Sequence, residues 1–169
     1  MDRFMFWLAI STAIFLTIVI VIIVIGLLLP EEHEAEGERE IAAPIEEAFA
    51  VIRNPEEYPR WRSGVRSVLK ESDTVWLEKD SHGHHIRYCF ESESRPSSLL
   101  VRILSEGLPY QGTWEYHFLK LGPYLTRVRI REQGKIYNPI FRFLSRFFFG
   151  HTATIHQILR ELSITLENK

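Results

Sequence analysis

The segment from Asn138 to Leu166 constrains the fold most, because its apolar residues recur at spacings of three and four. This spacing is typical of one broad face of an amphipathic helix. Nearly everything between residues 38 and 136 has the pattern of short strands, and a sheet with one apolar face needs a layer that buries it. We therefore expect this segment to form one long helix that covers a sheet, with a close approach or a bend at Gly150, a residue of low helix propensity. The residues of the expected sheet-facing side are Ile140, Phe143, Leu144, Phe147, Phe148, His151, Ile155, Ile158, Leu159 and Leu162.

The middle of the chain predicts a strand, two short helices and about six further strands. We expect the first strand at Glu38 to Ala43 and a helix opening at Pro44, since proline favours the first helical turn. A second helical turn is expected at Glu56 to Trp61. Apolar and polar residues then alternate, as they do in half-buried strands. The expected strands cover residues 65–71, 74–79, 84–91, 99–103, 112–118 and 126–132.

A different kind of helix is expected at the N-terminus, where Phe4 to Leu29 contains no charged residue. A helix of this length rises roughly 39 Å, enough to cross a hydrocarbon core of about 30 Å. Trp7 lies near one end, where interfacial aromatic residues are common. A cleaved signal peptide would have a shorter apolar run and a small-residue cleavage site. We therefore expect residues 1–30 to form an uncleaved single-pass anchor.

Charges beside the anchor favour one orientation. Arg3 precedes the apolar run, whereas acidic residues follow it up to Glu38. The positive-inside rule then favours a cytoplasmic N-terminus and a domain on the extracytoplasmic side. We interpret residues 31–37 as an acidic, solvated linker, with the folded domain covering residues 38–169.

Composition excludes several classes of function. The chain has 20 Lys and Arg against 22 Asp and Glu. It therefore lacks the surplus of basic residues that is typical of nucleic-acid-binding proteins. The single cysteine, Cys89, excludes an internal disulfide framework and a cysteine-clustered zinc site. His82, His84 and His85 surround an expected turn and would not converge on one point. We expect no metal and no cofactor.

The order of these segments resembles the START-like superfamily, also called SRPBCC, which includes polyketide cyclases, plant pollen-allergen relatives and lipid-transfer domains. The resemblance covers residues 38–166. It implies an α+β helix-grip fold, in which a curved antiparallel sheet of about six or seven strands wraps around a long C-terminal helix. Members bind hydrophobic molecules in an apolar cavity between sheet and helix, and only some are enzymes. The segments that carry the resemblance are Ile41–Phe49, Asn54–Trp61, Glu132–Gly134 with Tyr137–Pro139, and Phe149–Ala153.

The inner faces of these elements predict a ligand cavity. Glu132 alternates with Val128 and Ile130, so its carboxylate would face the cavity and could act as a general acid or base. The alternative is a rim residue bonded to backbone or water. His151 would present an imidazole to the cavity or serve as a hydrogen-bonded core residue. The expected lining residues are Trp76, Tyr88, Phe90, Val101, Ile103, Trp114, Tyr116, Val128, Ile130, Glu132, Phe147, His151 and Ile155.

Five phenylalanines occur within nine residues, at positions 141, 143, 147, 148 and 149. They are either buried on all sides or in contact with lipid at the mouth of the cavity, and we favour burial. The function we expect is a membrane-anchored domain that binds a hydrophobic small molecule or lipid. The alternatives are a cyclase- or dehydratase-like enzyme that uses Glu132 and His151, and an interaction module whose filled core binds no ligand.

Overall fold

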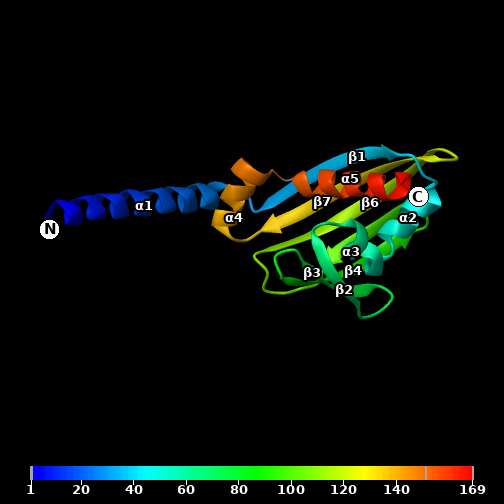
Figure 1. The fold of residues 1–169 in the computed structure, drawn as a ribbon, viewed down its shortest axis with the longest axis horizontal. Coiled ribbons are helices and arrows are strands. Elements are labelled where there is room, and N and C mark those ends of the chain that lie inside the picture. The colour runs from blue at the N-terminus through cyan, green and yellow to red at the C-terminus, as the bar shows by residue number, and fades with distance from the viewer. Residues whose placement is uncertain (1, 151, 169) are drawn as a thin grey trace.

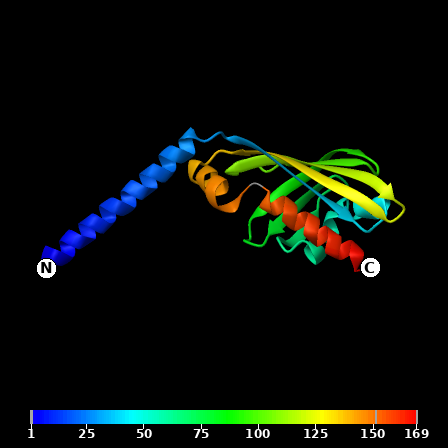
Figure 2. The same ribbon diagram turned by 90° about the horizontal axis from the view of Figure 1, so that it is seen from above.

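The computed structural model describes residues 2–150 and 152–168, with the side chains of Asp2 and Phe149 excepted. A long helix, α1 (Asp2–Leu28), projects from one end of an α+β domain (Figures 1 and 2). The domain begins with β1 (Glu32–Ile41), α2 (Ile45–Ile52), the 3-10 turn η1 (Pro55–Glu57) and α3 (Tyr58–Trp61). Six strands follow: β2 (Val65–Lys70), β3 (Val75–Asp80), β4 (His85–Ser94), β5 (Ser98–Ile103), β6 (Tyr110–Gly122) and β7 (Leu125–Ile136). The chain then forms α4 (Pro139–Leu144), the π-helical turn η2 (Ser145–Phe149) and α5 (Ala153–Glu167).

The seven strands form one antiparallel sheet in the order β1-β7-β6-β5-β4-β3-β2. The sheet curves around α5, which lies along its inner face, and α2 and α3 pack beside α5 in the same core (Figure 1). Alternate residues of each strand point inward, because successive side chains in a strand face opposite sides. The α+β helix-grip fold expected from the sequence is confirmed.

The hydrophobic core fills the part of the sheet farthest from α1. Val128 and Ile130 of β7 are fully buried and belong to the same cluster as Leu159 and Leu162 of α5. Phe49 of α2 packs edge-on against Phe118 of β6, with ring centroids 5.5 Å apart. Burial of each such side chain contributes about 1.5–3 kcal/mol. The core therefore fixes α5 and α2 against this half of the sheet.

The acidic segment 31–37 is not a linker, as the sequence interpretation had it, because β1 starts at Glu32 and pairs with β7 along its whole length. The glutamates at positions 32, 34, 36, 38 and 40 occupy its outer face. On β7, the outer face carries Arg127, Arg129, Arg131 and Lys135, and these basic groups pair with the glutamates. The expected boundary at residue 38 was therefore too late. The acidic side chains of β1 therefore form ion pairs with β7 and are not merely exposed to solvent.

The helix expected from Asn138 to Leu166 is not continuous, because the structure breaks it into α4, η2 and α5, and α5 begins beyond Gly150, where the sequence indicated a bend. Asn138 caps α4, and its side-chain oxygen accepts hydrogen bonds from the backbone N–H groups of Ile140 and Phe141. Gly150 ends η2 with φ of 70°, a left-handed conformation that glycine adopts without steric cost. The break turns α5 onto the sheet and leaves α4 beside α1.

Helix α4 contacts the last turns of α1. Gly26 makes this approach possible, since a methyl group there would collide with the carbonyl oxygen of Pro139. The expected burial of the phenylalanines is wrong for three of them: Phe141, Phe147 and Phe148 are 46%, 58% and 71% exposed. Residues 3–28 of α1 are long and apolar enough to cross a membrane.

Candidate ligand-binding site

A cavity of about 530 Å³ lies between the sheet and α5, at the end of the domain nearest α1. Its volume is within the range of small-molecule sites, about 300–1,000 Å³. Strands β1, β4, β6 and β7 contribute its inner wall, and α4, η2 and α5 contribute the facing wall. The lining residues include His33, Arg62, Ile86, Tyr88, Tyr110, Trp114, Glu132, Ile136, Phe141, Ser145, Gly150, Thr154, Gln157, Ile158 and Glu161.

Glycines interrupt the row of inner side chains of the sheet beside the cavity. Gly112 and Gly134 are paired across β6 and β7 near this end of the sheet. A side chain at Gly134 would collide with the imidazole of His33, so glycine allows that ring to lie across β7. The break at Gly150 adds to the opening, because no continuous helix covers this end of the sheet.

Glu132 is the centre of one polar cluster in the cavity. The indole Nε1–H of Trp114 donates a hydrogen bond to its Oε2 at 3.0 Å. The other carboxylate oxygen lies 3.4 Å from Nε2 of His33. A carboxylate that accepts an indole N–H forms a charge-assisted hydrogen bond, which is stronger than a neutral one. The carboxylate is therefore held in a fixed position on the cavity wall.

Arg62 forms a second polar cluster with Glu78, whose side chain is almost fully buried. Arg62 Nη1 donates to Glu78 Oε2 at 3.3 Å, and its guanidinium lies over the ring of Tyr58 at 4.8 Å. Burial lowers the pKa of Arg62, but the Glu78 carboxylate and nearby tyrosines outweigh burial and raise it. Burial also raises the pKa of Tyr88, which lines the cavity. Arg62 is therefore a permanent cation, and the Tyr88 phenol stays protonated.

The predicted lining residues divide into several groups. Tyr88, Trp114 and Glu132 line the cavity, and Ile103 lines a separate groove. Phe147 is exposed and does not line the cavity, and His151 lies outside the described residues. The others are core residues: Trp76, Phe90, Val101, Tyr116, Val128, Ile130 and Ile155. The inner face was identified correctly, but most of it is occupied by packed side chains.

Several polar residues in the cavity wall or directly behind it were absent from the sequence prediction. Glu78 and Asp80 alternate with Trp76 on the inner face of β3, and this period of two could have indicated them. Arg62 has no comparable signal, because it lies in the loop after α3. Asp80 is bonded to His84, with 3.0 Å between Oδ2 and Nδ1. Burial raises the pKa of Asp80, but the hydrogen bonds from His84 outweigh burial and lower it.

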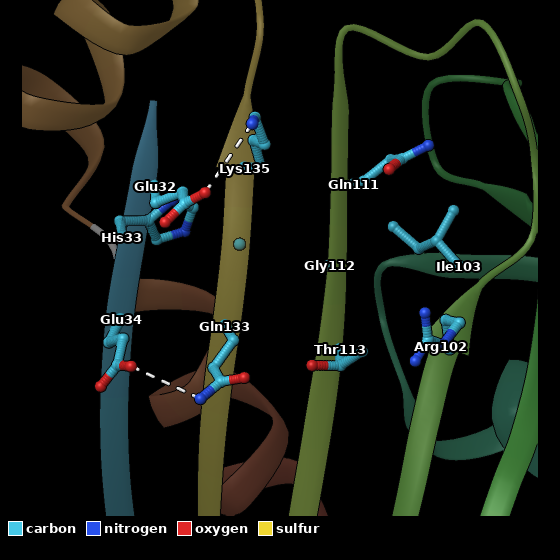
Figure 3. A pocket seen from close by; sticks show the side chains of 11 residues that line it. Glu32, His33, Glu34, Arg102, Ile103, Gln111, Gly112, Thr113, Gln133 and Lys135 are labelled. Atoms are coloured by element: carbon cyan, nitrogen blue, oxygen red, sulfur yellow. Dashed lines mark hydrogen bonds and ion pairs between the residues drawn. The ribbon is translucent and has the colours of Figure 1, made fainter. Parts of the chain in front are cut away.

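A second hollow, of about 450 Å³, runs over the ends of β1, β7, β6 and β5 (Figure 3). Its polar groups already have partners: Glu32 lies 3.7 Å from Lys135, Gln133 donates to Glu34 at 3.4 Å, and Arg102 pairs with Glu91 outside the groove. We assign no ligand to this groove. Among the described residues, no three His, Cys, Asp or Glu side chains converge as metal ligands do.

The residues that form the domain match the model of one known protein family. The family described as Polyketide cyclase / dehydrase and lipid transport matches residues 32–161. No match was found among curated proteins.

Three solved structures illustrate the likeness in fold. A START superfamily protein from Mycobacterium smegmatis has 12% identity and a TM-score of 0.67, over 80% of this chain and 98% of that chain. A conserved protein from Geobacillus kaustophilus has 12% identity and a TM-score of 0.67, over 80% and 96%. Norcoclaurine synthase from Thalictrum flavum, in complex with dopamine and hydroxybenzaldehyde, has 15% identity and a TM-score of 0.62, over 82% and 88%. At these identities the likeness establishes the fold alone.

Proposed function

Because this chain belongs to the polyketide cyclase / dehydrase and lipid transport family, we propose that it binds a hydrophobic small molecule or lipid. The site is the cavity between the sheet and α5. The observation that carries this proposal is the cavity itself, which is large and combines apolar wall surface with several polar and charged side chains. Such a combination is typical of sites for organic ligands. A ligand-free interaction module would not need an open space of this size.

The walls favour an amphipathic ligand. Ile86, Ile136 and Ile158 supply apolar surface for a chain or ring system. The Glu132 carboxylate and the Arg62 guanidinium supply one acceptor and one donor group on the same cavity. Burying a polar ligand group is costly unless it is hydrogen-bonded. We therefore expect an apolar body with at least one hydrogen-bonding group.

Helix α1 anchors this binding domain in a membrane. Its most apolar 18-residue stretch has a mean hydropathy of 3.1, and the helix is long enough to cross the hydrocarbon core. Arg3 in the first turn of the helix and the acidic residues after the helix favour a domain on the extracytoplasmic side. The anchor would keep the cavity within reach of molecules dissolved in the bilayer.

Native mass spectrometry of the full chain, extracted in mild detergent, tests the proposal. We expect a lipid or other hydrophobic molecule to copurify in about equal amount with the protein. Thr154→Trp places an indole at the cavity mouth and should reduce this occupancy. Ile164→Trp is the matched control on α5, because Ile164 is exposed and does not line the cavity. Ligand-free protein, or equal occupancy in both variants, would overturn the proposal.

A second candidate function is proton transfer by Glu132. The observation that favours it is the position of the carboxylate on the cavity wall, oriented by Trp114 and close to His33. The test is incubation of the extracted protein with the copurified ligand and a search for a product that differs in mass, as after loss of water, or in chromatographic retention, as after an isomerisation that conserves mass. Glu132→Gln should retain the ligand and abolish the product. If the unmutated protein forms no product, this candidate is excluded and the binding role stands.

A further inference from the structure

Exposed phenylalanines gather where α1 meets the domain. We call Pro139–Phe149, which comprises α4 and η2, the phenylalanine segment. Phe141, Phe147 and Phe148 are all about half exposed or more, and Phe143 packs against Phe147 and Phe148 at 4.9 and 6.1 Å. Contiguous exposed apolar patches on soluble domains usually mark an interaction site. This patch therefore needs a partner.

The attachment of the segment to α1 identifies that partner. Gly26 packs against Pro139, and Arg142 donates a hydrogen bond to the carbonyl oxygen of Leu29 at 2.9 Å. At 1.5 Å per residue, Gly26 lies about 4.5 Å inside the apolar run that ends at Leu29. Amphipathic helices at membrane surfaces bury their apolar face by about 5–10 Å. The contact with α1 thus holds the segment at interfacial depth.

We propose that the phenylalanine segment inserts into the bilayer that α1 crosses, and that the ligand cavity opens onto this inserted surface. The inference rests on the proposed anchoring by α1. The composition of the segment fits an interfacial position, because it contains no acidic residue. Arg146 is exposed beside the phenylalanines, and its guanidinium can reach lipid phosphates while its stem stays in apolar surroundings.

Phe141 connects the patch to the cavity. Its ring is 46% exposed and also lines the cavity, together with Ser145 and Gly150 from the same region. One wall of the cavity is therefore formed by the segment that contacts lipid. A hydrophobic ligand can then move between bilayer and cavity without exposing its apolar surface to water, which would be unfavourable.

Spin-label accessibility in phosphatidylcholine nanodiscs tests the insertion. The full chain with Cys89→Ser receives one label at a time, at Phe148→Cys, Ile14→Cys or Tyr124→Cys. Ile14 lies in the middle of α1, and Tyr124 lies in the β6–β7 turn at the end of the domain farthest from α1 (Figure 1). Each label is exposed to oxygen, which concentrates in bilayers, and to a water-soluble nickel chelate, which does not.

We expect the ratio of oxygen to nickel collisions to be several-fold higher at Phe148 and Ile14 than at Tyr124. A lipid-like ratio at Ile14 with a water-like ratio at Phe148 would overturn the insertion and leave the anchor intact. Water-like ratios at both positions would overturn the anchor and, with it, this inference. Native mass spectrometry tests the ligand cavity independently of either outcome.

Discussion

Arg142 donates a hydrogen bond from Nη1 to the carbonyl oxygen of Leu29, at 2.9 Å, and thereby ties α4 to the end of α1. Its Nη2 donates to the carbonyl oxygen of Tyr137 at 3.2 Å, and Glu31 lies 3.7 Å away. The side chain is only 7% exposed. A buried guanidinium is costly unless it is paired and hydrogen-bonded. One residue therefore joins the N-terminal helix, β1 and the phenylalanine segment.

Arg142→Met should destabilise the junction by about 1–3 kcal/mol, because it leaves two backbone carbonyl groups without their donors. The matched control is Arg146→Met, since Arg146 is exposed on the same segment and should cost less than about 0.5 kcal/mol. Thermal unfolding in detergent, followed by circular dichroism, measures the difference. Equal effects of the two variants would contradict the structural role of Arg142.

Gly26→Leu should force α1 away from α4, because its side chain would collide with the backbone of Pro139. Overpacking of this kind costs about 1–3 kcal/mol. Ala13→Leu is the control, since Ala13 is exposed on the same helix. Pulsed-EPR distances between labels on Ile14 and Tyr124 should broaden in Gly26→Leu alone. An unchanged distribution would show that the close approach is dispensable.

Removing residues 1–37 should unfold or severely destabilise the domain, whereas removing residues 1–30 should not. The longer deletion removes the first six residues of β1, together with the ion pair between Glu34 and Arg131. Each lost backbone hydrogen bond costs roughly 1 kcal/mol. Urea unfolding of the two fragments compares them. Equal stability would mean that residues 31–37 do act as a linker.

Trp114→Phe should cost about 1.5–3 kcal/mol, since the Glu132 carboxylate would lose a charge-assisted hydrogen bond. Trp61→Phe is a matched control, because the Trp61 indole N–H has no hydrogen-bond partner in the described part of the chain. Urea unfolding of the variants measures stability, and native mass spectrometry measures ligand occupancy. If Trp61→Phe costs as much, the indole bond to Glu132 is not the cause.

Acid should weaken the fold partly through Glu93. Hydrogen bonds from Arg53, at 2.6 Å, and from Arg95 lower the pKa of this carboxyl below its usual value of 4.5. A lowered folded-state pKa gives stabilisation that is complete above the unfolded pKa and is lost as pH falls through the folded value. Glu93→Gln should therefore lower the melting temperature at pH 7 and reduce its further fall on acidification below about pH 4.5.

Glu46→Gln is the control for this experiment. Glu46 is an exposed carboxylate, and the described part of the chain offers it no ion pair. Its replacement should leave the pH dependence of the melting temperature as in the unmutated protein. A Glu93→Gln variant that unfolds with the unmutated pH profile would contradict the role of the Arg53 pair.

The sequence by itself determined the order of the strands along the chain and the inward-facing residues of β7. Alternation at Val128, Ile130 and Glu132 placed all three side chains inward, as the structure shows, because the period of a strand is fixed by backbone geometry. The same period at Glu32, Glu34 and Glu36 could have predicted β1. The same glutamates also fit a solvated linker, because glutamate is common in linkers. The basic partners on β7 are about 100 residues away, so no local pattern indicates the pairing.

Only the tertiary structure decided where the inner face is open. Val128 and Glu132 have the same periodicity, yet one is buried against α5 and the other lines a cavity. The difference depends on the break at Gly150, on the contact between α1 and α4, and on the ring of His33 lying over Gly134. These are long-range packing relations that no local pattern encodes. The exposure of Phe148 was decided in the same way, because helical periodicity cannot show that a helix ends before it reaches the sheet.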